Sequence, residues 1–349
     1  MEKPTIRFKG YTEDWEQRKL GDNIVEYTEK TTENNQYPVL TSSRKGIFFQ
    51  TDYYDGNQIA SADNTGYNIV PYGYFTYRHM SDDEIFHFNI NDIAENGIVS
   101  TLYPVFTTDE NLDSRYLQYQ LNYGREFSRY AILQKQGGSR TYMYLNKLRN
   151  LYLTVPTAIE EQKKISEYFT NLDHLITLHQ RKCEETKILK KYMLQKMFPQ
   201  NGQKVPEIRF KGFTEDWEQR KLNEIADKVS EKNKNNEFSE PFTNSAEQGI
   251  ISQKDYFDRE IVNNENLNGY YIVRNDDFIY NPRISVTAPV GPINRNRLGR
   301  NGVMSPLYTV FRTHDIDNLY LEFYFKTTKW HRFMKLNGDS GARFDRFTI

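Results

Sequence analysis

The feature that most constrains the fold of this chain is a repeated segment. Residues Pro4–Leu20 and Pro206–Leu222 agree at fifteen of seventeen positions and differ only at Thr5/Glu207 and Tyr11/Phe213. The chain has 349 residues, which is enough for about two domains of ordinary size. A segment that recurs after an offset of 202 residues therefore predicts two copies of one domain.

Weaker matches continue through the rest of both halves. At an offset of 203 residues they are Pro38/Pro241, Gly46/Gly249, Asp52/Asp255, Asp55/Asp258, Val70/Val273, Phe75/Phe278 and Tyr77/Tyr280. GIVSTLYPVF from Gly97 matches GVMSPLYTVF from Gly302, and the turn Gly138–Arg140 matches Gly341–Arg343. The period is far longer than that of a solenoid repeat, so it indicates a duplicated globular domain.

Each half carries patterns of both strands and helices. Alternating runs at residues 67–77 and 269–280 are typical of strands, and longer runs at 111–130 and 318–336 are typical of helices. The fold class that we predict is α+β, with two similar mixed α/β domains joined by a long helix of coiled-coil type.

Between the halves lies a segment that is typical of one long helix. Residues 157–198 contain neither Gly nor Pro, and Pro156 and Pro199 flank them. At 1.5 Å per residue this segment would form a rod of roughly 60 Å. An imperfect coiled-coil stripe runs along it, made of Ile165, Phe169, Leu172, Ile176, Cys183, Met193 and Met197. A single rod cannot bury such a stripe, so we expect part of it to face a partner.

The predicted boundaries are a first domain at residues 1–156, a helical spacer at 157–203 and a second domain at 204–349. Ile349 corresponds to Asn146 of the first half, so the second half lacks a counterpart of the long helix. We expect either a shortened chain or another polypeptide that supplies the missing helix.

Composition excludes several functional classes. The formal net charge is −1, which gives no whole-protein attraction to nucleic acid. A single cysteine excludes a disulfide framework and a thiolate zinc cluster. No apolar run is long enough to span a membrane and no leader is recognisable, so we expect a cytoplasmic protein without a membrane partner.

Motifs for catalysis are also missing. His174 and His179 are five residues apart, which does not fit a metal pair on one helix face. Asn281-Pro282-Arg283 has only part of the Asn-Pro-Pro-aromatic motif of amino-methyltransferases, and no phosphate-binding glycine loop occurs. We therefore expect a non-enzymatic protein with no catalytic residue, cofactor or metal.

The repeated segment, the TAIEEQKKISEYFTNLDHLI run and their order resemble the specificity subunit of type I restriction-modification systems. The resemblance covers essentially the whole chain. It implies a DNA-binding subunit with two target-recognition domains, each reading one half of a split double-stranded DNA sequence. It also implies partners: two methyltransferase (modification) subunits on the helical spacer, and restriction (motor-nuclease) subunits in the full complex.

From the stripe on the helix we predict a partner interface at Ile165, Phe169, Leu172, Ile176, Met193 and Met197. The alternative function is a truncated assembly scaffold that binds methyltransferase partners without productive DNA recognition. A complex of defined mass with no target-dependent methylation would favour the scaffold.

Candidate DNA-binding residues lie where the two halves differ. After Tyr77 the first half reads RHMSDDEIFHFNINDIAEN, with five acidic residues, whereas the second half reads NPRISVTAPVGPINRNRLGRN, with none. Unlike loops on a common scaffold are typical of target selection. The candidates are Tyr77, Arg78, His79, Lys135 and Arg140 in the first half, and Arg283, Arg295, Arg297, Arg300 and Arg343 in the second.

Plainer interpretations of these residues stay open. The loops fit ordinary solvated surface, and Arg140 and Arg343, which follow glycine-rich turns, fit either a phosphate clamp or a structural salt bridge. Trp15 and Trp217 follow a possible N-cap threonine, so we predict that both tryptophans are packing anchors.

Overall fold

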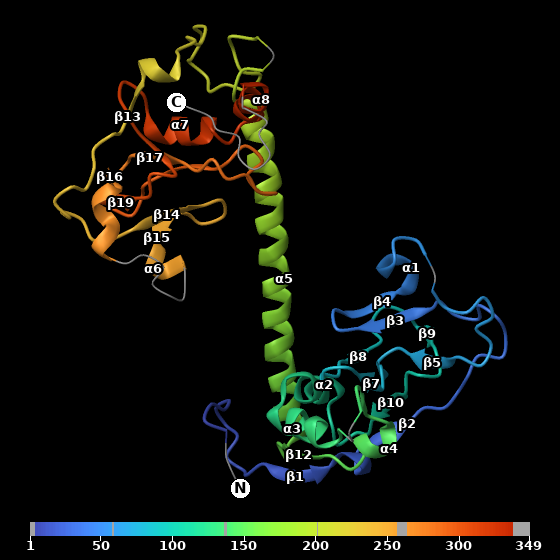
Figure 1. The fold of residues 1–349 in the computed structure, drawn as a ribbon. Helices are drawn as coiled ribbons and strands as arrows, with labels where there is room; N and C mark the ends of the chain where they lie inside the picture. Colours follow the sequence, from blue (N-terminus) through green and yellow to red (C-terminus); the bar gives the residue numbers. More distant parts are fainter. Residues whose placement is uncertain (1–3, 58, 136–137, 201, 257–263, 338–349) are drawn as a thin grey trace. The chain divides into compact units, whose positions relative to one another are not determined.

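The computed structural model describes residues 4–57, 59–135, 138–200, 202–256 and 264–337. The chain forms two compact units, Met1–His179 and Gln180–Ile349 (Figure 1). The predicted long helix is confirmed: α5 spans Ile159–Lys196, and its two halves belong to the two units. It begins three residues after Pro156 and ends three residues before Pro199, as expected where proline limits a helix.

A four-stranded antiparallel sheet forms the centre of the first unit. Its strand order is β2–β10–β6–β8, with bounds Ile24–Glu26, Val105–Thr108, Phe75–Tyr77 and Phe88–Ile90. Four two-stranded antiparallel ribbons surround it: β1 (Glu16–Lys19) with β12 (Tyr152–Val155), β3 (Leu40–Ser43) with β4 (Gly46–Phe49), β5 (Asn68–Pro71) with β9 (Asn96–Val99), and β7 (Met80–Ser81) with β11 (Thr141–Tyr142).

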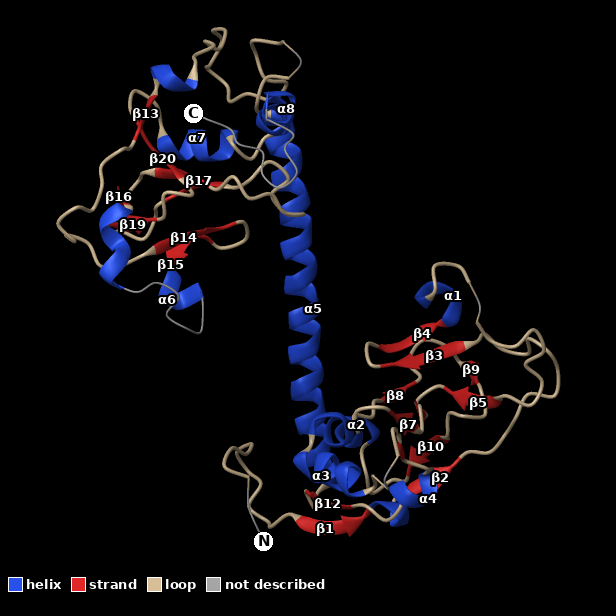
Figure 2. Cartoon of the chain, in the orientation of Figure 1, coloured by secondary structure: helices blue, strands red, loops and turns tan. Residues whose placement is uncertain are grey.

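Helices α2 and α3 of the first unit lie beside the start of α5, as Figure 2 shows. The bounds of the helices in this unit are η1 Leu20–Asp22, α1 Gln50–Tyr53, α2 Ser114–Tyr123, α3 Arg125–Leu133 and α4 Leu145–Leu148. The single helix predicted at 111–130 is wrong in one respect, because it breaks at Gly124. A side chain there would meet the Gln120 carbonyl oxygen at 2.3 Å, so only glycine fits this close turn.

The second unit repeats the topology of the first. Its central sheet has the order β13–β20–β17–β18, with bounds Ala226–Lys228, Thr309–Thr313, Phe278–Tyr280 and Ile293–Arg295. Two ribbons match β3–β4 and β5–β9, namely β14 (Phe242–Ser245) with β15 (Gly249–Ser252) and β16 (Tyr271–Val273) with β19 (Gly302–Met304). The helices are η2 Leu222–Glu224, α6 Gln253–Tyr256, η3 Asn264–Gly269, α7 Asn318–Tyr324 and α8 Thr328–Asn337.

The predicted strands at 67–77 and 269–280 each contain two strands. In the first unit a turn separates β5 from β6, where Tyr74 N–H donates to the Pro71 carbonyl over 3.1 Å and Gly73 has a φ of +84°. In the second unit Asp277 N–H donates to Arg274, and Asp276, with a φ of +70°, takes the place of the glycine. A turn that needs positive φ at its third residue explains both breaks.

The cores of the two units use matched aromatic residues. Phe75 stacks on Phe106 with ring centroids 4.6 Å apart, and their counterparts Phe278 and Phe311 stack at 5.4 Å. All four side chains are completely buried. Since the aromatic pair joins strands β6 and β10, or β17 and β20, it fixes the centre of each sheet.

Candidate nucleic-acid interface

Two of the predicted DNA contacts lie in the core. Tyr77 is fully buried, packs on Phe88 at 4.4 Å between ring centroids, and donates its hydroxyl to the Met143 carbonyl over 2.9 Å. Burial raises the pKa of Tyr77, so the phenol stays a neutral donor. His79 is 7% exposed and its Nδ1 faces the Leu102 carbonyl. Burial of both side chains contradicts direct DNA contact, because neither ring reaches the surface.

The acidic segment Asp82–Glu84 pairs with three cations of the first unit. Arg140 Nε lies 2.8 Å from Asp82, Lys135 pairs with Glu84, and Arg44 pairs with Asp83. Arg44 and a hydrogen bond from Ser81 lower the pKa of Asp83, which keeps that carboxylate charged. Two predicted cations, Lys135 and Arg140, are therefore held in ion pairs, although both side chains remain about half exposed.

Arg78 differs from these cations, since its guanidinium makes no ion pair with a residue that the structure describes. It is exposed and follows the end of β6. The chain then enters the β7–β11 ribbon, where Met80 lies opposite Tyr142. Tyr142 and Tyr144 are 37% and 48% exposed, and their rings stack at 5.9 Å beside His79.

Sequence reasoning missed Tyr142 and Tyr144. The signal was present in the alternation of Thr141–Tyr144, because residues two apart in an extended chain share one face. Together with Arg78, these two tyrosines form a surface that we call the ribbon patch. It places a cation and two aromatic rings at the surface of the first unit.

In the second unit, three of the predicted arginines pair with acids from other parts of the chain. Arg297 lies 2.6 Å and Arg295 lies 3.3 Å from the carboxylate of Glu322, which is 8% exposed. Burial pushes the pKa of Glu322 up, but Lys326 and Arg297 outweigh it and hold the pKa below its ordinary value. The Glu322 carboxylate therefore stays charged beside Arg295 and Arg297.

Arg300 makes a two-pronged pair with Glu240. Its Nε and Nη2 donate to the two carboxylate oxygens over 2.7 and 2.8 Å. This pair lowers the pKa of Glu240. Two parallel hydrogen bonds hold the Arg300 guanidinium to Glu240, just before β14. This contact fixes the conformation of the loop between β18 and β19 around Arg300.

Arg283 resembles Arg78, since it is exposed and its guanidinium makes no ion pair with a described residue. It follows the end of β17, the strand that matches β6, and its backbone N–H donates to Asn281 over 2.9 Å. Among the predicted contacts that the structure describes, the two arginines without an ion pair, Arg78 and Arg283, thus follow matched strands of the two sheets. Arg343, the last candidate, lies outside the described residues.

The predicted stripe on α5 has both covered and exposed positions. Ile165 is partly buried and packs against the core of the first unit. Phe169, Leu172 and Ile176 are 43%, 37% and 53% exposed. Met193 and Met197 are partly buried in the second unit. Further exposed apolar residues of α5 are Leu175, Leu178, Ile188 and Leu189.

The first turns of α5 join the rest of the first unit through buried polar groups. Glu161 is 1% exposed and accepts two hydrogen bonds from Arg7, over 2.6 and 2.8 Å. Gln162 is completely buried, accepts from Asp113 N–H over 2.9 Å and donates to the Pro156 carbonyl. The Glu-Gln pair of the sequence therefore has a structural role at this joint.

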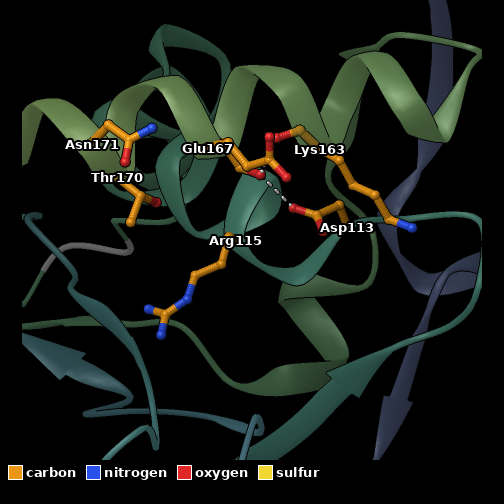
Figure 3. Close-up of a pocket in the computed structure, with 7 residues that line it drawn as sticks. Asp113, Arg115, Lys163, Glu167, Thr170 and Asn171 are labelled. Carbon is orange, nitrogen blue, oxygen red and sulfur yellow. Dashed lines mark hydrogen bonds between the residues drawn. The ribbon is translucent and has the colours of Figure 1, made fainter.

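A polar cleft of about 560 Å³ lies along the joint between α2 and α5 (Figure 3). The Asp113 carboxylate caps α2 by accepting from Tyr116 N–H, and it also accepts from Ser166 over 2.9 Å. Farther along α5, the Tyr119 hydroxyl donates to the Asp173 carboxylate over 2.6 Å. Burial and this hydrogen bond raise the pKa of Tyr119 to about 12, so the hydroxyl keeps its proton. These groups hold the helix, and the described cleft contains no metal-ligand cluster.

The tryptophans pack as predicted. Trp15 meets Tyr116 edge to face at 6.5 Å, and Trp217 contacts Tyr320 at 5.8 Å and Phe198 at 6.0 Å.

Among the described residues, no helix combines the length and apolar character that a membrane span requires.

Comparison with known proteins defines the class as a DNA specificity domain. Residues 12–187, just over half of the chain, match the family described as type I restriction modification DNA specificity domain. The chain belongs to this family. No curated protein matches the chain significantly.

The likeness to one solved structure supports the fold. The type I restriction-modification S subunit from M. genitalium is 11% identical, with a TM-score of 0.51 over 95% of this chain and 82% of that one. The HsdS subunit from Thermoanaerobacter tengcongensis is 16% identical, with a TM-score of 0.42 over 91% and 81% of the two chains. A structure from a study of type I R-M assembly and conformational transition is 15% identical, with a TM-score of 0.46 over 97% and 83%.

Proposed function

We propose that this chain is the sequence-recognition subunit of a type I restriction-modification complex, in which each unit reads one half of a bipartite double-stranded DNA target. The observation that carries the proposal is a common sheet with unlike loops. Strands β6 and β17 occupy the same place in the two sheets, but acidic residues follow the first strand and arginines follow the second. Loops that vary on a constant scaffold are suited to target selection.

For the first unit we propose the ribbon patch as the reading surface. A two-stranded ribbon fits the major groove of B-DNA, and an arginine can bond both acceptors of a guanine there. Tyr142 and Tyr144 add aromatic contact area beside Arg78. Lys135 and Arg140 would bind phosphates of the DNA backbone if their ion pairs with Glu84 and Asp82 break.

For the second unit the same reasoning favours Arg283. It is exposed, follows the matched strand, and has no carboxylate partner among the described residues. Arg297 and Arg300 are half exposed and would contribute phosphate contacts, whereas Arg295, only 15% exposed, would hold the loop in place.

The proposed partners follow from the family. Residues 1–156 and 204–349 would be the recognition domains, and residues 157–203 would be a spacer that docks two methyltransferase subunits. The exposed apolar residues Phe169, Leu172 and Ile176 support a docking role for α5. Methyl transfer and cleavage would belong to the methyltransferase and restriction subunits, with no cofactor held by this chain.

Mapping of adenine methylation with purified methyltransferase partner, with and without this chain, tests the proposal. We expect methylation at one bipartite motif only when the chain is present. Footprinting of the complex should protect two short blocks about one helical turn apart, the spacing of half-sites read from one face. Methylation of the same motif without the chain, or one continuous protected block, would contradict the proposal.

A scaffold that binds methyltransferase subunits without reading DNA is the second candidate. The ion pairing of Lys135, Arg140, Arg297 and Arg300 favours it, since these cations already have partners. A stable complex with the methyltransferase that shows no motif-dependent methylation would select the scaffold.

A further inference from the structure

Three consecutive acids of the first unit pair with cations from three separate segments of the chain. We call these acids, Asp82–Glu84, the acidic segment. Arg44 lies in the turn between β3 and β4, Lys135 follows α3, and Arg140 directly precedes β11. The pairs span 39, 51 and 58 residues of sequence. The fold therefore brings three distant cations, including Arg44, to one short stretch of carboxylates.

The acidic segment lies directly beside the ribbon patch. Ser81, the last residue of β7, pairs with Thr141 of β11. Asp82 therefore leaves one ribbon strand where Arg140 enters the other, and their side chains meet over 2.8 Å. The acids and their cations thus continue the surface on which we place DNA recognition in the first unit.

These ion pairs are open to solvent. The side chains of Arg44, Lys135 and Arg140 are 54%, 47% and 49% exposed. Exposed ion pairs contribute little to stability, because water screens them and because holding two long side chains together costs conformational entropy. Contacts between cations and DNA phosphates are favoured by the release of counterions from the DNA. A DNA backbone can therefore take over these cations without disturbing the core of the unit.

The acidic segment also has contacts of its own that hold it in place. The Ser81 hydroxyl donates to the Asp83 carboxylate over 2.8 Å, and Ile85 N–H donates to it over 3.3 Å. The carboxylates therefore stay near the cations when the cations turn toward DNA. The corresponding segment of the second unit, residues 281–301, contains no acid, so this arrangement belongs to the first unit.

We propose that the acidic segment is an intramolecular competitor of the DNA backbone, whose carboxylates occupy in the free chain the cations that bind phosphates in the complex. Arg44, Lys135 and Arg140 then form a phosphate-binding site that is neutralised until DNA displaces the acids. This inference rests on the proposed function, because it takes the first unit to bind double-stranded DNA.

Such competition favours the target over other DNA. A duplex that makes only backbone contacts gains little at this surface, since three ion pairs must break and three carboxylates remain nearby. A target that also contacts Arg78 and the two tyrosines of the ribbon patch gains enough to displace the acids. The acidic segment therefore lowers the affinity for random sequence more than the affinity for the target.

Binding of the full chain to a short duplex of random sequence tests the competition. The test variant combines Asp82→Asn, Asp83→Asn and Glu84→Gln, which keep the size of the side chains. Its affinity should rise about tenfold or more, and the slope of log affinity against log salt should steepen by about two to three, since each added phosphate contact contributes about 0.9. Fluorescence anisotropy over a series of salt concentrations measures both quantities.

A control variant with the same change of charge separates this local effect from net charge. Glu33→Gln, Glu95→Gln and Glu110→Gln remove three exposed acids of the first unit that pair with no described cation. Both variants move the formal net charge from −1 to +2. The control should change the affinity by less than about threefold, and equal gains in the two variants would overturn the proposal.

Removal of the cations gives the opposite result. In the test variant, the further changes Arg44→Ala, Lys135→Ala and Arg140→Ala should return the affinity and the salt slope to wild-type values or below. If the triple change of acids prevents folding, Asp82→Asn alone should steepen the slope by about one. A test variant that folds, by circular dichroism, but binds random duplex no more tightly than wild type would overturn the proposal.

The result is distinguishable from failure of the proposed function. Motif-dependent methylation by the wild-type chain with its partner, together with no gain in the test variant, would overturn the competition and leave target recognition intact. A gain in the test variant without any motif-dependent methylation would support the phosphate-binding site and contradict the reading of a sequence.

Discussion

Asn91 and Asn296 each donate two hydrogen bonds to backbone carbonyls, in similar places of the two units. The Asn91 amide donates to the Val70 and Ala94 carbonyls over 2.8 and 2.9 Å, and the Asn296 amide donates to the Arg274 and Arg300 carbonyls over 3.0 and 2.9 Å. Both side chains are completely buried. Each amide thus ties the end of one ribbon strand to the loop after the central sheet, on which the candidate interface is built.

Replacement of Asn91 or Asn296 by Ala should lower the free energy of unfolding of the affected unit by roughly 2 to 4 kcal/mol, because two buried carbonyls lose their donors. Urea unfolding followed by circular dichroism measures the change. The matched control is Asn146→Ala, since Asn146 is exposed and its loss should cost about 0.5 kcal/mol or less. Equal effects of the buried and exposed substitutions would contradict this structural role of Asn91 and Asn296.

The duplication and the long helix were predictable from the sequence, because both rest on patterns that repeat along the chain. The same comparison matched Phe75 with Phe278, and the structure places both in the core. The buried amides were not predicted. Asn91 and Asn296 lie in segments whose sequences differ, and an asparagine in a loop gives no sign that its amide is enclosed.

The surroundings of the predicted interface residues could not be predicted, because local sequence says nothing about distant partners. Tyr77 was chosen for its place before a variable loop, but it is the last residue of a fully buried strand. Arg295 and Arg297 come from a stretch without acids, yet Glu322 on α7 neutralises them from a position 25 or more residues away. Arg78 is exposed because it lies just beyond the end of β6, whose three residues are all buried.

Gly97 and Gly302 occupy matched positions where a side chain has no room. A Cβ atom on Gly97 would lie 2.2 Å from Leu40 Cδ1, and one on Gly302 would lie 2.4 Å from Phe242 Cζ and 2.8 Å from the Glu240 carbonyl oxygen. Alanine at either position should destabilise its unit by about 1 to 3 kcal/mol through overpacking. We expect Gly302→Ala to cost more, because a backbone oxygen yields less than a leucine side chain. Thermal unfolding should leave Gly269→Ala, which has open space, near wild type.

Glu322 pairs with Arg295 and Arg297, so these two candidate DNA contacts also have a structural role in the second unit. Arg295→Ala leaves a carboxylate that is 8% exposed with one fewer cation, so it should destabilise the second unit by about 1 to 3 kcal/mol. Arg295→Ala combined with Glu322→Gln should recover part of this loss, since the amide carries no charge. A double-mutant cycle of unfolding free energies measures the coupling, and strictly additive effects would contradict it.

The Glu240–Arg300 pair gives the second unit an acid-sensitive contact. Arg300 lowers the pKa of Glu240 below its ordinary 4.5. A group with a lowered pKa adds stability above the unfolded-state pKa and loses it as the pH falls through the folded-state pKa. Glu240→Gln should therefore destabilise the chain by about 1 kcal/mol or less at neutral pH, and the difference from wild type should shrink below pH 4.5. Urea unfolding across this range measures it, and a pH-independent difference would contradict the pair's contribution.

Arg78 and Arg283 should act on separate halves of the target, because they follow matched strands in different units. In the complex with methyltransferase, Arg78→Ala should weaken DNA binding by about 1 to 3 kcal/mol and relax base preference in one protected block, as loss of a two-pronged guanine contact does. Arg283→Ala should affect only the other block. Arg181→Ala on α5 is the control, since its exposed guanidinium pairs with Glu185. Methylation assays on targets randomised in one block at a time distinguish the three variants. If Arg78→Ala and Arg283→Ala alter the same block, the assignment of one half-site to each unit is wrong.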